Sequence, residues 1–120
     1  MGLNTIDDAT KRVAASVVAG FPDPSWQAIR YLSRWTPKGD VGADDFFVTR
    51  EGVERPEFPR DVGATMAISR AAQDQLAVVE AAGQPRWYMM ALRIDRSGKY
   101  SVDFTYFDNY VEGDIMKSVE

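Results

Sequence analysis

Residues 87–106 read WYMMALRIDRSGKYSVDFTY, and this run predicts a β-hairpin. The expected turn is residues 95–98, where Gly98 supplies the positive φ that a type I turn with a bulge requires. The return strand alternates apolar with polar residues, which predicts one face in the core and one in water. Its expected inward residues are Tyr100, Val102, Phe104 and Tyr106.

The strand before the turn, residues 87–94, alternates in the same way. Its expected inward residues are Tyr88, Met90, Leu92 and Ile94. Trp87, Met89 and Ala91 are therefore expected to point outward. Exposed aromatic and methionine side chains often anchor interfaces, so Trp87 and Met89 form one candidate partner-binding patch. The alternative is that a second layer of structure covers that face.

Two amphipathic helices are expected before this hairpin. The first spans residues 3–19, is capped by Asn4 or Thr5, and stops at Gly20. The second spans residues 65–82 and stops at Gly83. The expected buried stripes are Ile6, Ala9, Val13 and Val17 in the first helix, and Ile68, Ala72, Leu76 and Val79 in the second.

The segments between the two helices are less regular. Residues 24–35 fit either a helix capped by Ser25 or a strand with Ile29, Tyr31 and Trp35 on one face. Their aromatic content slightly favours the strand. Residues 46–50 predict a short strand. Residues 54–59 contain two prolines, so we expect an extended loop that Phe58 pins to the body of the domain.

Composition limits the possible functions. The chain has 120 residues, no cysteine and no histidine, which removes disulfides, thiolate metal sites and histidine general bases. Its length and 45% hydrophobic content fit one domain, residues 1–120. A net charge of −4 disfavours nucleic acid and favours a basic protein partner. No signal-peptide or membrane-spanning pattern occurs, and a cysteine-free chain fits the cytoplasm.

No phosphate-binding loop, nucleophile elbow or metal motif is present in the sequence. The adjacent carboxylates, Asp7-Asp8 and Asp44-Asp45, point apart on a strand or loop and are expected to be solvated. We therefore expect no catalytic residue, no cofactor and no metal, and a protein that is not an enzyme. A second candidate partner-binding surface is acidic and aromatic, and comprises Asp103, Asp108, Tyr110, Glu112 and Asp114.

The order of elements, with Arg86-Trp87 leading into LRIDRSGKYSVDFTY at residues 92–106, resembles the YezG-type antitoxin and immunity proteins of bacterial polymorphic toxin systems. In that family a W...L.I..DGKFKVDF.Y hairpin follows the second helix. The resemblance covers most of the chain in element order, and only the hairpin is motif-like. It implies a strand for residues 25–35 and a cytoplasmic protein that binds and blocks one cognate toxin domain, commonly a nuclease. The proline-rich loop at residues 55–59 and the tail beyond Tyr106 depart from the family.

The expected fold is α+β, with a mainly antiparallel four-stranded sheet, two helices on one face and the order α-β-β-α-β-β. The expected function is an immunity protein that occludes the active site of a contact-delivered or secreted toxin. One alternative is a small-molecule binder or isomerase of the nuclear transport factor 2 kind, with one buried aspartate as base. Its expected pocket lining is Tyr31, Trp35, Tyr88, Phe104 and Tyr106. A further alternative is a homodimer formed through an exposed strand edge.

Overall fold

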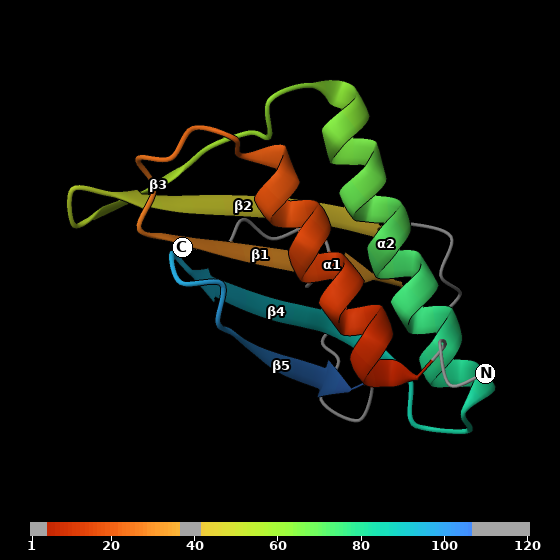
Figure 1. Cartoon of the computed structure of the whole chain (residues 1–120). Coiled ribbons are helices and arrows are strands. Elements are labelled where there is room, and N and C mark those ends of the chain that lie inside the picture. The colour runs from red at the N-terminus through yellow and green to blue at the C-terminus, as the bar shows by residue number, and fades with distance from the viewer. Residues whose placement is uncertain (1–4, 37–41, 107–120) are drawn as a thin grey trace.

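The computed structural model describes residues 5–36 and 42–106. Two helices lie side by side on one face of a five-stranded antiparallel sheet (Figure 1). The elements in chain order are α1 (Ile6–Gly20), β1 (Ala28–Trp35), β2 (Gly42–Arg50), β3 (Val53–Pro56), α2 (Val62–Ala81), β4 (Trp87–Asp95) and β5 (Tyr100–Tyr106). The predicted α+β class is confirmed. The predicted four strands and the order α-β-β-α-β-β are wrong, because β3 lies between β2 and α2.

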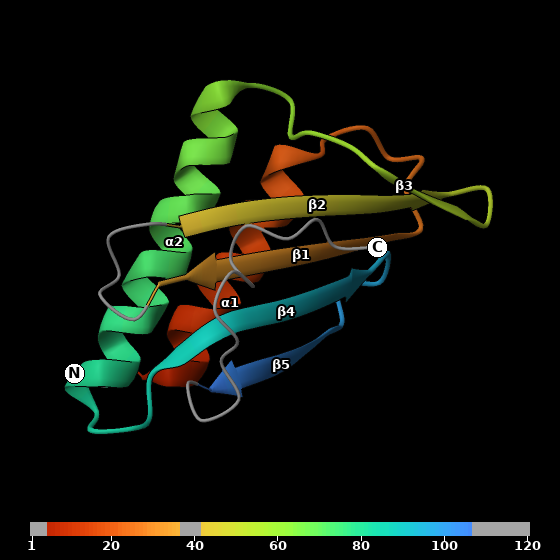
Figure 2. The ribbon, with the colours of Figure 1, turned by 180° about the vertical axis from the view of Figure 1, so that it is seen from behind.

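The strand order across the sheet is β3-β2-β1-β4-β5. The central strand β1 is antiparallel to β2 on one side and to β4 on the other. Tyr31 on β1 lies opposite Phe46 and Leu92, and all three side chains join the core beneath the helices. The reverse face of the sheet carries neither helix (Figure 2).

Both helices begin at a capping side chain. The Thr5 hydroxyl accepts the Asp8 N–H at 3.1 Å, and the Asp61 carboxylate accepts the Ala64 N–H at 2.7 Å. Because Asp61 supplies this cap, α2 begins at Val62, three residues before the predicted start at residue 65. Both predicted apolar stripes lie against the core.

Residues 28–35 form a strand, as the resemblance implied. The helix alternative arose because β1 is buried on both faces along most of its length, so its sequence lacks a clean alternation. Ile29, Tyr31 and Trp35 all point toward the helices, as the strand interpretation required. The neighbouring strand β2 begins at Gly42, four residues before the predicted start at residue 46.

The prediction of a loop for residues 54–59 is wrong for its first part, because Val53–Pro56 form β3. Glu51 and Gly52 have φ values of 52° and 78°, so they make the two-residue turn that joins β2 to β3. Such turns favour Asn-Gly or Asp-Gly, and a glutamate in the first position conceals the signal. Pro56 is tolerated because β3 is an edge strand.

Trp87 was expected to point outward, and this prediction is also wrong. It is 1% exposed, and its Nε1–H donates to Gln75 Oε1 at 2.7 Å. The β4–β5 register shifts between Trp87 and Met89, so Tyr88 is an extra residue in the ladder. This bulge turns both Trp87 and Met90 toward the helices, whereas strict alternation would have separated them.

Within the part of the chain that the structure describes, neither helix combines the length and apolar character needed to cross a membrane.

Candidate protein-binding surface

Three large apolar side chains are exposed together where the chain leaves β3 and enters α2. The exposed fractions are 87% for Phe58, 75% for Val62 and 56% for Met66. These residues are four apart, so Val62 and Met66 lie on adjacent turns of one side of α2. We call Phe58, Val62 and Met66 the apolar stripe. Contiguous exposed apolar surface of this kind is typical of interaction sites.

The backbone beside the stripe is firmly attached to α1. The Arg60 N–H donates to Gly20 O at 2.8 Å, and the Arg60 guanidinium donates to Ala19 O at 2.8 Å. Pro59 is buried, and its Cβ lies 3.3 Å from the position that a Cβ on Gly20 would occupy. The prediction that Phe58 pins this segment is therefore wrong. Neighbouring side chains in an extended segment point in opposite directions, so Pro59 turns inward and Phe58 outward.

Two surface hollows meet at Phe58. The first has a volume of about 190 Å³, and its lining residues are Asp44, Asp45, Phe46, Phe47, Pro56, Glu57 and Phe58. The second has a volume of about 370 Å³, and its lining residues are Phe58, Pro59, Asp61, Val62, Thr65 and Met66. Among the residues that the structure describes, three carboxylates and no basic side chain line the first hollow. The apolar stripe thus adjoins a hollow lined by two carboxylates of β2 and by Glu57, which follows β3.

Asp44 was expected to be solvated, and this prediction is wrong, because Asp44 is half-buried and is the most constrained of these carboxylates. The Tyr31 hydroxyl donates to Asp44 Oδ1 at 2.8 Å. Burial raises the pKa of Asp44, and the Tyr31 hydroxyl together with the nearby side chains of Ser69 of α2 and Ser33 opposes that rise. Burial also raises the pKa of Tyr31 well above its ordinary value. The arrangement ties β1, β2 and α2 together at the acidic hollow.

The other two carboxylates, Asp45 and Glu57, form ion pairs with arginines. Glu57 accepts two hydrogen bonds from the Arg50 guanidinium, at 2.8 and 3.1 Å. Asp45 pairs with the buried Arg34. Because Arg50 belongs to β2 and Glu57 follows β3, their bidentate pair orients the chain that leads to Phe58.

The candidate residues chosen from the sequence do not gather into one site. Trp87 lies in the core. Met89 is half-buried and Asp103 is exposed, and both lie on the sheet face away from the helices. The remaining candidates lie outside the described residues, and they are Asp108, Tyr110, Glu112 and Asp114.

The rings predicted to line a small-molecule pocket are also dispersed. Tyr31 is fully buried and stacks on Phe46 with 5.0 Å between ring centroids, and Trp35 is 8% exposed. Phe104 and Tyr106 lie elsewhere, in a hollow of about 230 Å³ that they share with the edge of Trp87 and with residues of both helices.

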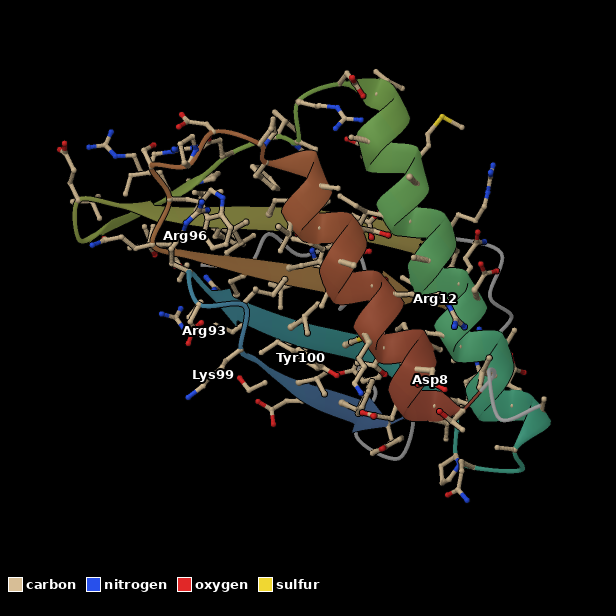
Figure 3. All side chains as sticks on the ribbon, viewed as in Figure 1. Asp8, Arg12, Arg93, Arg96, Lys99 and Tyr100 are labelled. Carbon is tan, nitrogen blue, oxygen red and sulfur yellow. The ribbon has the colours of Figure 1, made fainter. Side chains whose placement is uncertain are left out.

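A basic cluster lies at the opposite end of the hairpin strands. Arg93, Arg96 and Lys99 surround the β4–β5 turn (Figure 3). The Arg96 guanidinium carbon lies 4.3 Å from the ring centroid of Trp26, which places Arg96 over that ring. Arg96 therefore contacts Trp26 within the domain.

The apolar stripe was missed at the sequence level although a signal for it exists. Val62 and Met66 repeat at helical spacing but fall outside the row formed by Ile68, Ala72, Leu76 and Val79. A second apolar row on one helix indicates either a second buried contact or an exposed patch. Burial of the first row against the sheet leaves the second row in solvent.

Comparison with protein-family models and with curated proteins found no match to this chain. Among residues 5–36 and 42–106, no group of three or more acidic side chains is arranged to hold a metal ion.

Proposed function

We propose that this chain is an immunity-type protein that binds a toxin domain in the bacterial cytoplasm and neutralises it by covering its active site. The observation that carries the proposal is the apolar stripe, whose three side chains stand in solvent on a backbone bonded firmly to α1. Rigid exposed apolar anchors bind proteins at little cost in conformational entropy. The resemblance of the hairpin to YezG-type proteins supports the toxin as the partner.

The net charge of the chain supports the proposal that its partner is basic. The chain carries a net charge of −4, and the hollow beside the stripe is lined by Asp44, Asp45 and Glu57, of which Asp45 is paired with Arg34 and Glu57 with Arg50. The net negative charge of the chain would speed the approach of a basic toxin. Neutralisation then requires no chemistry, because an interface of about 1,600 Å² is large enough to cover a catalytic cleft.

The small-molecule alternative has less support from the geometry. Tyr31 and Trp35 fill the core, so they cannot line a ligand pocket together with Phe104 and Tyr106.

The proposal can be tested with one matched set of variants. Wild type, the double variant Phe58→Ser/Met66→Ser and the control Val53→Ser would each be used to capture partners from the source bacterium. Val53 is an exposed residue on β3 outside the stripe. We expect wild type and Val53→Ser to retain one protein in equimolar amount, and the double variant to lose it.

The captured domain would then be expressed alone in a sensitive strain. We expect it to stop growth, and we expect co-expression of wild type, but not of the double variant, to restore growth. A captured domain that is harmless, or one that the double variant still neutralises, would refute the proposal.

A further inference from the structure

One half of β2 has an unpaired outer edge. β3 pairs with residues 47–50 of β2, and the Glu57 N–H adds one bond to Phe46 O at 3.1 Å. No described strand pairs with the outer edge of residues 42–45. Alternate residues of an antiparallel strand direct their N–H and C=O groups to the same side. Since Phe46 O points outward, the backbone groups of Asp44 and Gly42 point outward too.

The apolar stripe borders this open edge. Ser69 of α2 lies near the Asp44 carboxylate and affects its pKa, so that side of the helix lies over the edge of β2. Met66 precedes Ser69 by three residues and Val62 precedes it by seven, which places all three along one side of the helix. The acidic hollow contains Asp44, and the second hollow contains Val62 and Met66. The two hollows meet at Phe58, so the open edge and the apolar stripe lie on neighbouring surfaces; we call these two surfaces together the groove.

The geometry points to β-strand addition: a short extended segment of the partner protein pairs with residues 42–45 of β2 and lies against the apolar stripe. This inference deepens the proposed function by naming the part of the partner that is bound. About four residues of extended chain, about 13 Å, would fill the open edge. Main-chain bonds would supply affinity, and the alternating side chains would supply specificity.

The chemistry of the groove defines the segment. Alternate side chains of an added strand face the helix side and the reverse side of the sheet. On the helix side they would meet Val62 and Met66, which favours apolar residues. On the reverse side they would meet the Asp45 carboxylate, which is paired with the buried Arg34 but keeps a side-chain exposure of 34%, so its outer part can still contact a lysine or arginine of the segment. A second copy of this chain is disfavoured, because edge-to-edge pairing would bring two sets of carboxylates together.

The experiment uses the full chain, labelled with ¹⁵N, and the acetylated and amidated peptide Lys-Val-Lys-Val-Lys-Val-Lys. The matched control peptide has glutamate in place of each lysine. We expect saturation with the lysine peptide to slow hydrogen exchange of the Asp44 amide by about tenfold or more. We expect the glutamate peptide to bind at least about tenfold more weakly. Equal binding of the two peptides, or binding without protection of Asp44, would overturn the inference.

Two helix variants locate the site. Met66→Lys places a positive charge beside the groove, and Ala77→Lys places the same charge about 16 Å further along α2. We expect only Met66→Lys to weaken the lysine peptide, by about tenfold, with the urea midpoint unchanged. Equal weakening by both variants, or concentration-dependent dimerisation that itself protects Asp44, would refute strand addition by a partner. Peptide binding without toxin neutralisation would refute only the proposed function, and neutralisation without Asp44 protection would refute only this inference.

Discussion

Replacing Gln75 by leucine should destabilise the fold, because it breaks the side-chain hydrogen bond that joins α2 to Trp87 of β4. Gln75 is fully buried, and its amide group accepts from Trp87 Nε1 at 2.7 Å and donates to Thr10 Oγ1 at 3.1 Å. Leucine has a similar size and keeps the site filled, but it cannot accept the indole proton. The Trp87 N–H would then be buried without an acceptor.

The expected magnitude follows from which groups lose their partners. An unsatisfied buried donor costs about 1–3 kcal/mol. Thr10 still donates its own hydroxyl proton to Ile6 O at 2.8 Å, so the loss falls mainly on Trp87. The greater apolarity of leucine offsets part of this cost. We therefore expect Gln75→Leu to lower the free energy of unfolding by about 2 kcal/mol.

Equilibrium unfolding in urea, followed by tryptophan fluorescence, would measure the change. The control is Gln73→Leu, the same substitution at an exposed position of α2, for which we expect a change below about 0.5 kcal/mol. Thermal unfolding should agree, with a Tm lower by roughly 8 °C for Gln75→Leu. If Gln75→Leu unfolds at the same urea concentration as wild type, the assignment of Gln75 as the required acceptor is wrong.

Three further predictions concern Gly42, Asp44 and Asp61. A Cβ at Gly42 would lie 2.8 Å from ring atoms of Trp35, so we expect Gly42→Ala to cost about 1–3 kcal/mol in urea unfolding, whereas Gly63→Ala should cost nothing. Burial raises the pKa of Asp44 in the folded state, so the stability that Asp44 contributes is lost as pH rises through that pKa. The uncharged Asp44→Asn variant should therefore gain stability relative to wild type between about pH 4 and pH 7. A stability difference between the two proteins that stays constant across that range would contradict the burial effect. The hydrogen bond from the Ala64 N–H lowers the pKa of Asp61, so the stability that the Asp61 carboxylate contributes is present at neutral pH and lost as pH falls. Asp61→Ala should therefore reduce the urea midpoint at neutral pH and reduce it much less in acid. An equal reduction at both pH values would exclude the charged cap.

The elements that could be predicted are those whose information is local. The buried row of α2, from Ile68 to Val79, repeats at helical spacing, and Gly98 has the expected positive φ of 90° in its turn. The β3 strand could not be recognised, because Glu51 is an unusual residue for its turn and Pro56 argues against a strand unless the strand lies at an edge. Edge position is a property of the whole sheet, and four residues cannot encode it.

The residues of the candidate site also could not be predicted from local sequence. Trp87 and Phe58 are both large aromatic residues in segments that suggest alternation, and their predicted positions were the reverse of those in the structure. A one-residue bulge next to Trp87 and the burial of Pro59 next to Phe58 account for the two reversals. Each depends on a contact with residues remote in the chain.

By itself, the sequence determined the two helices, the final hairpin and the residues that the helices turn toward the sheet, because helical and strand periodicities act over a few neighbouring residues. The tertiary structure alone decided which apolar side chains stay in solvent and where the edge of the sheet is left open. Whether Phe58, Val62 and Met66 are buried depends on packing between α1, α2 and the sheet, and those surfaces meet only after the chain has folded.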